Sequence, residues 1–415
     1  MFLTIGEKIR QAREKYGLKQ IAFESYGFSR NYISMIETEK RSLNENMLRN
    51  VYDAICELSN CDYQQYYSYN EFIKSPVEQA REWLEQHCNL QDALNQYETF
   101  NKIASDFDLI EYKIKIETLL GLHYVKNDEL LAANVHLLKA IGYCIQVTKN
   151  PASLYEVVGT NYITLGQYQE AISILQLSIN CQEGDRGRNI NRIRYYISLC
   201  YLNQAKYEKS LEWIIPVLEQ NEYLQPKAAA YLIKSTILKR QGRDELGREL
   251  LLELINNPFY EDYLGYAYHN LGYSFKDSGL YQQALDCLKI ALPLRETVKQ
   301  RSITKCLMGE VYFRIGNYEK AHSLLVEVKD IIFHKGSLEQ QEATLEWGLD
   351  LYLETQDFES MLILLEDIQK LVDKEILDEF IYTKFQNRLY KRIMDDVLGQ
   401  QKDLNEYRIL LDAIT

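Results

Sequence analysis

The feature that most constrains the fold is a five-position pattern that recurs seven times along the chain. A small residue is followed three positions later by an aromatic residue, seven later by Gly or a polar residue, nine later by Tyr and twelve later by Ala or Ser. One complete copy consists of Gly159, Tyr162, Gly166, Tyr168 and Ala171. Copies begin at Gly121, Gly159, Ser198, Ser235, Gly272, Gly309 and Leu349. The copies at 121, 235 and 349 are weaker. A spacing this regular predicts one supersecondary unit repeated in tandem.

Each unit is predicted to be a helical hairpin. Small residues allow two helices to approach closely, Gly ends the first helix, and Tyr packs between the two. With 6 Pro and 19 Gly in 415 residues, the composition also favours an all-α chain. The pattern resembles the tetratricopeptide repeat, whose period is about 34 residues. That resemblance implies a right-handed superhelix with a concave inner face. Residues 76–110 are expected to add a degenerate first repeat, and residues 375–415 a capping helix pair.

Charge and cysteine usage limit the classes of function. The net charge is −13. Residues 1–58 have a net charge of about +1 and the rest of the chain is acidic, so only this first segment suits contact with a nucleic acid. The 8 cysteines are scattered without a C-x-x-C pair, which favours buried free thiols over a metal site. There is no signal peptide and no apolar run of about 20 residues. We therefore expect a soluble cytoplasmic protein with no membrane contact, no metal and no cofactor.

The first 58 residues have the helix spacing of a helix-turn-helix. An amphipathic helix carrying Ile5, Ile9 and Ala12 stops at Gly17, and a short second helix runs from about Gln20 to Gly27. Ser29 has the chemistry of an N-cap for a third helix, residues 30–37, and Asn44 for a fourth. The Tyr-rich segment 59–75 lacks an apolar period and runs into Pro76. We predict a DNA-binding domain at 1–58, a linker at 59–75 and a repeat domain at 76–415.

Residues 5–58 resemble the Cro/repressor (XRE-type) helix-turn-helix family. The motifs that carry the resemblance are Gly17-Leu18-Lys19-Gln20, Ser29 to Glu37, and Lys40-Arg41-Ser42-Leu43-Asn44. The resemblance implies base reading by the start of the third helix and phosphate contacts around it. The implied base-reading residues are Arg30, Asn31 and Ser34, and the other implied DNA contacts are Gln20, Ser29, Tyr32, Lys40 and Arg41.

Two departures from the family pattern bear on DNA binding. The second helix is one residue short, with Glu24 near the place of a small Ala, and Glu39 replaces a usual Gly. The alternative interpretation is a four-helix capping bundle that binds no nucleic acid.

The inner face of the repeat domain is predicted from offsets relative to the first pattern residue. In tetratricopeptide arrays this face comes from the first helix of each hairpin. These offsets select as peptide-binding candidates Arg192, Tyr195, Tyr196, Asn203, Lys239, Tyr266, Asn270, Tyr273 and Lys276. Asn can pair with a peptide backbone, Lys and Arg with a carboxylate, and Tyr adds contact area. The alternative is that many of these Tyr residues merely fill grooves between helices.

The order of parts resembles the RRNPP family of Gram-positive quorum-sensing regulators, especially its longer, NprR-like members. The resemblance implies that the array binds a short signalling peptide, which changes how two protomers pair on a palindromic double-stranded DNA operator. The alternative is a scaffold that sequesters a partner such as a response regulator. No phosphate loop, H-E-x-x-H or G-x-S-x-G motif is present, so we expect no enzymatic activity.

Overall fold

The computed structural model describes residues 2–181, 188–220, 224–374, 376–400, 407–408 and 411. Its residues form two compact units, Met1–Gly184 and Asp185–Thr415. Throughout the described ranges the regular structure is helical, without a strand, so the prediction of an all-α chain is confirmed. The predicted single repeat domain is instead divided between the two units.

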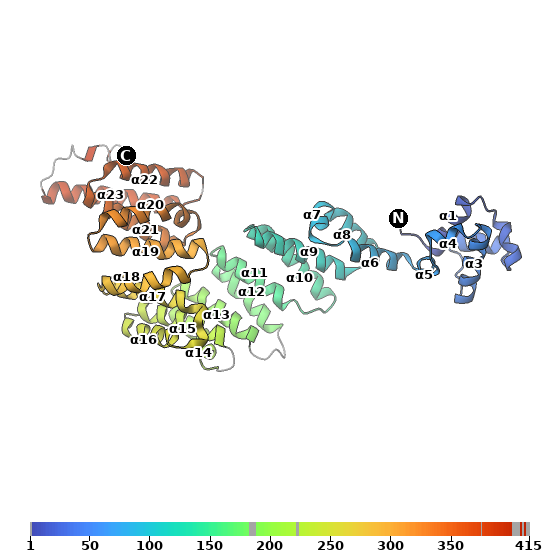
Figure 1. Ribbon diagram of the computed structural model, residues 1–415, viewed down its shortest axis with the longest axis horizontal. Coiled ribbons are helices and arrows are strands. Elements are labelled where there is room, and N and C mark those ends of the chain that lie inside the picture. The colour runs from blue at the N-terminus through green and yellow to red at the C-terminus, as the bar shows by residue number, and fades with distance from the viewer. Residues whose placement is uncertain are drawn as a thin grey trace. The chain divides into compact units, whose positions relative to one another are not determined.

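The N-terminal unit holds the head and the first hairpins (Figure 1). The head consists of α1 (Ile5–Lys15), η1 (Gln20–Tyr26), α2 (Arg30–Glu37), α3 (Glu45–Leu58), α4 (Asp62–Tyr66) and α5 (Tyr69–Ile73). Three shorter helices follow, α6 (Pro76–His87), α7 (Leu90–Asn95) and α8 (Tyr97–Asp106). Two hairpins complete the unit, α9 (Ile110–Lys126) with α10 (Leu130–Gln146), and α11 (Ala152–Thr164) with α12 (Tyr168–Asn180). Residues 76–110 are therefore three short helices and the start of α9, not the degenerate hairpin that we predicted.

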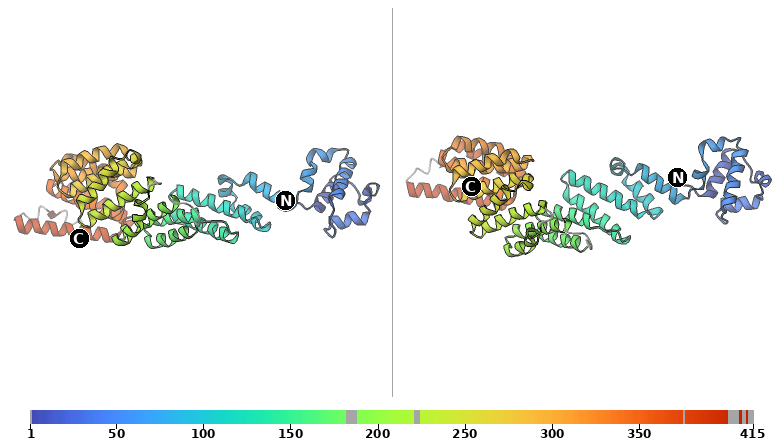
Figure 2. Two further views of the ribbon diagram at one scale, coloured as in Figure 1. Left: turned by 90° about the horizontal axis from the view of Figure 1, so that it is seen from below. Right: turned by 60° about the horizontal axis from the view of Figure 1, so that its bottom comes forward.

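The C-terminal unit stacks five hairpins, and the views in Figure 2 show the same stacking. The hairpins are α13 (Arg188–Asn203) with α14 (Tyr207–Leu218), α15 (Leu224–Arg240) with α16 (Asp244–Ile255), α17 (Leu264–Asp277) with α18 (Tyr281–Ala291), α19 (Val298–Arg314) with α20 (Tyr318–Lys335), and α21 (Leu338–Thr355) with α22 (Phe358–Asp373). Two short 3₁₀ segments, η2 (Pro258–Tyr263) and η3 (Leu292–Leu294), flank the third hairpin, and α23 (Glu379–Gln400) follows the last. The predicted partner of this capping helix falls mostly outside the described residues.

Each position of the sequence pattern has a defined place in a hairpin. The first residue lies where the two helices touch: a Cβ at Gly159 would come within 2.6 Å of the Leu175 side chain. The residue seven positions later adopts a left-handed backbone in all seven copies, namely at Asp128, Gly166, Ala205, Gly242, Gly279, Gly316 and Gln356. The residue nine positions later begins the second helix in every copy. The pattern thus records where each hairpin closes and turns.

The turn geometry predicts a stabilising substitution at Ala205. This residue is exposed and has φ of 55°. A left-handed conformation costs a residue with a side chain about 1–2 kcal/mol. Gly removes this strain, but it also increases the conformational entropy of the unfolded chain, which offsets about 0.4–1 kcal/mol of the gain. We expect Ala205→Gly to raise the free energy of unfolding of the second unit by about 0.5–1 kcal/mol. Gly279→Ala, at the equivalent turn, should lower it by a similar amount. Denaturant titration followed by circular dichroism measures both, and equal midpoints for both variants would contradict the argument.

The head has its own core, formed around Ile9, Phe23, Ile33 and Ile55. At Gly6 the backbones of α1 and α2 approach so closely that a Cβ would come within 2.3 Å of the Ile36 carbonyl oxygen. The capping predictions hold, since Ser29 accepts a hydrogen bond from the Tyr32 amide and Asn44 from the Met47 amide.

The segment predicted as a linker is packed against this core. It forms α4 and α5, and Tyr63 and Phe72 are buried with the head residues. The buried Lys8 ammonium donates to the carbonyls of Glu71, Phe72 and Lys74 at 2.7–2.9 Å. Burial lowers the pKa of Lys8 to about 8. The sequence did not reveal this arrangement because the aromatic residues follow no regular helical period.

The cysteines are free thiols, five of them buried, whereas Cys61 is exposed. In the described part of the chain no helix is both long and apolar enough to span a membrane.

Candidate functional site

A hollow in the C-terminal unit, which we call the inner cavity, has a volume of about 530 Å³. Ligand sites in proteins commonly have volumes of ~300–1,000 Å³. Its walls come mainly from α15, α17, α19 and α21, the first helices of four successive hairpins. Apolar side chains, among them Leu251, Ile303, Leu307 and Trp347, form part of the lining. One cavity therefore spans four repeats.

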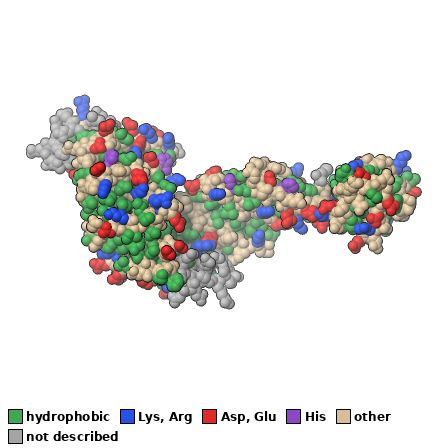
Figure 3. All heavy atoms as spheres, viewed as in Figure 1, with side chains coloured by type: hydrophobic (Ala, Val, Ile, Leu, Met, Phe, Trp, Pro, Cys, Tyr) green, Lys and Arg blue, Asp and Glu red, His purple; other side chains and the backbone are tan. Residues whose placement is uncertain are grey.

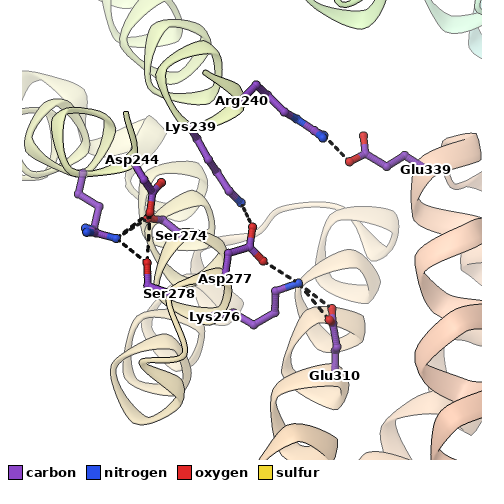
Figure 4. Close-up of polar contacts among 10 residues, drawn as sticks. Lys239, Arg240, Asp244, Ser274, Lys276, Asp277, Ser278, Glu310 and Glu339 are labelled. Carbon is purple, nitrogen blue, oxygen red and sulfur yellow. Dashed lines mark hydrogen bonds and ion pairs between the residues drawn. The ribbon is translucent and has the colours of Figure 1, made fainter. Parts of the chain in front are cut away.

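Ion pairs connect the hairpins around the inner cavity (Figure 4). Lys239 of α15 lies 2.7 Å from Asp277 of α17, and Lys276 lies 3.0 Å from both Asp277 and Glu310 of α19. Burial lowers the pKa of Lys239, while the carboxylates of Glu310 and Asp277 outweigh burial and raise the pKa of Lys276. The Lys239–Asp277 and Lys276–Glu310 pairs link the first helices of adjacent repeats.

A further ion pair joins repeats that are not adjacent in the sequence. Arg240, at the end of α15, pairs with Glu339, near the start of α21 (Figure 4). The two residues are 99 positions apart in the sequence. This pair therefore joins the second and fifth hairpins of the unit.

The charges around the inner cavity are balanced. Its lining contains six basic and six acidic side chains. Arg248, for example, donates to Asp244, which also accepts from Ser274. Figure 3 likewise shows acidic and basic side chains interspersed over the face of this unit that is in view. Most charged groups that a ligand would meet here are therefore already paired with one another, and few have a hydrogen-bond donor or acceptor left for the ligand.

Uncharged polar groups in the same wall are available to a ligand. Within the described residues, nothing bonds to the carboxamide of Asn270, which lines the cavity. Beside it, the Tyr273 ring lies under two ammonium groups, with the Lys239 Nζ at 2.9 Å and the Lys276 Nζ at 4.8 Å from the ring centre. A carboxamide offers both a donor and an acceptor, as an extended peptide backbone requires.

His269, in the same wall, is held in its neutral form. Burial lowers its pKa to about 3, and the positive charges of Arg295 and Lys239 act in the same direction. Its Nδ1 lies 3.1 Å from the Thr304 hydroxyl.

This histidine predicts a pH dependence of stability. The unfolded chain, with an ordinary pKa of about 6.5, binds the proton more readily than the folded chain. The contribution of neutral His269 to folding stability is therefore complete above about pH 6.5, and it is lost as the pH falls towards 3. We expect wild-type stability to fall by up to about 1.4 kcal/mol per pH unit in this window, relative to His269→Gln. Denaturant midpoints from pH 7 to pH 4 test this, and parallel curves for the two proteins would refute it.

A second hollow, which we call the tyrosine cavity, has a volume of about 400 Å³. Its lining consists of Arg192, Tyr195, Tyr196, Pro226, Ala229, Leu232, Asp262, Tyr263, Tyr266 and Glu296. The Tyr195 and Tyr196 ring centres are 5.3 Å apart, and those of Tyr263 and Tyr266 are 6.4 Å apart. Burial raises the pKa of Tyr195 and Tyr263, so both phenols are neutral at ordinary pH.

The predicted peptide-binding residues fall into two groups. Lys239, Asn270, Tyr273 and Lys276 line the inner cavity, and Arg192, Tyr195, Tyr196 and Tyr266 line the tyrosine cavity. Asn203 is exposed at the end of α13 and lines neither. The predicted set omits Glu310, Arg314, Glu346, Trp347 and Asp350, which line the inner cavity. The offsets used for the other repeats would have selected them in the repeats that begin at 309 and 349.

In the head, α2 presents the residues predicted to read DNA bases. Arg30 and Asn31 are exposed at its first turn, and Ser34 is half-buried one turn later. No described residue bonds to the side chains of Arg30 or Asn31. Both can therefore contact a ligand without breaking an existing interaction.

The predicted phosphate contacts surround this helix. The Arg41 guanidinium lies 4.9 Å from the Tyr32 ring centre, and Lys40 is exposed. Gln20 donates to Glu37 at 2.9 Å, so part of its amide is already used inside the head. The helix that it opens, η1, is a 3₁₀ helix. Glu39 has φ of 56°, a left-handed conformation that Gly adopts more readily than other residues.

The fold and cavities define an all-α protein of tandem helical hairpins with ligand-sized hollows. No family model matches the chain, and neither does any curated protein. Similar solved structures include the apo form of the quorum sensor NprR from B. thuringiensis, at 14% identity over 99% of this chain and 100% of that chain, with a TM-score of 0.43.

Two further structures are similar. NprR in complex with its cognate peptide NprX is 16% identical over 80% of this chain and 98% of that chain, with a TM-score of 0.48. The human IFIT1 dimer with m7Gppp-AAAA is 11% identical over 99% of this chain and 89% of that chain, with a TM-score of 0.49. Likenesses of this size assign no ligand, so the function has to be argued from the residues of this chain.

Proposed function

We propose that this chain is a cytoplasmic, non-enzymatic transcription regulator that binds DNA through its head and a short peptide through its repeats. The observation that carries the proposal is the inner cavity, to which four successive hairpins contribute equivalent positions. An extended peptide has a repeating backbone, and a wall built from repeats can contact it at several residues in turn. The NprR structure with its peptide NprX, although distant, is consistent with this proposal.

Peptide binding would act through the geometry of the hairpin stack. The pairs Lys239–Asp277 and Lys276–Glu310 link neighbouring hairpins, and Arg240–Glu339 links the second hairpin with the fifth. A ligand that contacts these hairpins favours the arrangement in which its contacts are best, and so shifts the equilibrium between arrangements. This shift would change how a pair of heads contacts DNA.

DNA binding is supported by the free Arg30 and Asn31 side chains on α2. One head makes few base contacts, whereas two heads related by symmetry can read a palindromic site. We therefore propose a homodimer as the DNA-binding form.

The experiment is a selection of randomised DNA duplexes on the full-length protein at stated salt, with and without a pool of peptides of five to eight residues. Enrichment of a palindrome that depends on retained peptide supports the proposal. Enrichment of no sequence in either condition would refute the DNA-binding part, and retention of no peptide would refute the peptide part.

A second candidate function is a scaffold that binds a partner protein, such as a response regulator. The observation that favours it is an apolar stripe on α10, where exposed Leu131, Val135, Leu138 and Ile145 follow a helical spacing. Their exposed fractions are 40–64%. Such a stripe suits contact with another protein, either a second copy or a different chain.

Light scattering and palindrome binding, measured on the wild type and on the double variant Leu131→Glu with Val135→Glu, separate the two candidates. Loss of a dimer in light scattering, together with loss of palindrome binding, supports the regulator. A wild-type chain that is monomeric and binds no DNA would favour the scaffold.

A further inference from the structure

One arginine of the C-terminal unit is buried without a counter-charge. Arg295 follows η3 and is 6% exposed, and its Nε and Nη1 atoms have no hydrogen-bond partner among the residues that the structure describes. Among the described residues no carboxylate lies within ion-pair distance of its guanidinium. Burial lowers its pKa below the ordinary arginine value. Burying a charged group without hydrogen-bond partners is unfavourable, so the Arg295 guanidinium would be stabilised by a hydrogen-bond acceptor.

The surroundings hold this guanidinium in place. Its central carbon lies 4.4 Å from the ring centre of Tyr266, whose hydroxyl accepts from Gln300 at 2.5 Å. Arg301 donates to the carbonyls of Arg295 and Glu296 at 2.9 and 2.8 Å, which fixes the local backbone. The Tyr266 ring stabilises the positive charge in part, but it supplies no hydrogen-bond acceptor for the guanidinium.

Arg295 itself lines neither cavity, but residues next to it line both. Its stacking partner Tyr266 lines the tyrosine cavity, and its charge acts on His269, which lines the inner cavity one turn along α17. By contrast, Lys239, Arg240 and Lys276 are already paired with acids of the chain.

We propose that Arg295 binds a carboxylate of the peptide ligand, supplied either by its C-terminus or by an Asp or Glu side chain. A carboxylate accepts strong, charge-assisted hydrogen bonds from guanidinium N–H groups, and the Nε and Nη1 of Arg295 both have donors that no described residue uses. Asp262 and Glu296 line the tyrosine cavity. They would repel further negative charge, so the favoured ligand carries one carboxylate rather than an acidic run. The inference rests on the proposed peptide binding.

The test uses three synthetic pools of peptides of five to eight residues, each incubated with the full-length protein and quantified by mass spectrometry after equilibrium dialysis. The first pool has free C-termini and no Asp or Glu. The second has amidated C-termini and one Asp or Glu, and the third has amidated C-termini and no acid. We expect wild-type protein to retain the first or second pool at least tenfold better than the third. Which of the two is retained identifies the source of the carboxylate.

The variants separate a binding role from a structural one. Arg295→Gln should remove the preference while retention of the neutral pool persists, Arg295→Lys should keep part of it, and Arg243→Gln, at an exposed arginine outside both cavities, should keep all of it. If Arg295→Gln fails to fold, the order in which the wild type retains the three pools, and the retention by Arg295→Lys, still test the inference.

Equal retention of all three pools by the wild type would overturn the inference and leave peptide binding standing, as would an unchanged preference in folded Arg295→Gln. Retention of no pool would overturn peptide binding itself, and the inference with it.

Discussion

Replacing Trp347 with alanine should lower the free energy of unfolding of the hairpins formed by α19–α22 by about 3–5 kcal/mol. The Trp347 side chain is 2% exposed and belongs to the core of the C-terminal unit. Its ring fits against Gly309, where a Cβ would come within 2.9 Å of Cη2. Alanine removes most of the buried apolar surface and leaves a hole that this close packing cannot fill.

Hydrogen exchange measured by mass spectrometry on the full-length chain gives this loss locally. Protection in α19 and α21 should fall by about a hundredfold or more. Trp347→Phe, which keeps an aromatic ring, should lose clearly less, and Gly309→Ala should also destabilise the same helices because it pushes against the ring. Unchanged protection in Trp347→Ala would mean that the ring does not pack as described.

The double variant Arg30→Ala with Asn31→Ala should lose sequence-specific DNA binding by about a hundredfold or more, since each base contact discriminates by about 1–3 kcal/mol. The head should remain folded, because both side chains are exposed and bond to nothing in the described residues. Weak binding that depends on salt should persist, as it depends on phosphate contacts. Fluorescence anisotropy on a selected duplex and on a scrambled one measures both quantities.

The matched control for this variant is Lys40→Ala with Arg41→Ala. It should weaken binding to every sequence alike and reduce the dependence on salt. If the Arg30 and Asn31 variant retained full discrimination between the two duplexes, the base-reading role of α2 would have to be abandoned.

Much of the repeat architecture could be predicted because it depends on contacts close in the sequence. The left-handed turns at Gly166 and Gly316 lie where the pattern predicts the end of each first helix, and the second helices begin two residues later, at Tyr168 and Tyr318. A hairpin of about 37 residues contains its own close approach, its turn and its groove, so its geometry is recorded within each copy. Most of the predicted inner-face residues line one of the two cavities for the same reason, because one set of offsets applies to every repeat.

The remaining features depend on contacts between distant parts of the chain. Tyr63 and Phe72 were predicted to lie in a linker, but Lys8 and the head core hold the segment through contacts about 60 residues apart in the sequence. The pairing of Arg240 with Glu339 likewise depends on how four hairpins stack. No local pattern encodes such distances.

The sequence by itself determined the helical hairpins, their turns and the faces that line the cavity, because each depends on residue size and backbone preference within one repeat. Only the tertiary structure decided which charges are paired and which is left alone. Arg295 looks like any other arginine in the sequence, and its isolation results from burial against Tyr266 where no acid is within reach. Burial and pairing are properties of the assembled stack, because they depend on what neighbouring hairpins place around each side chain.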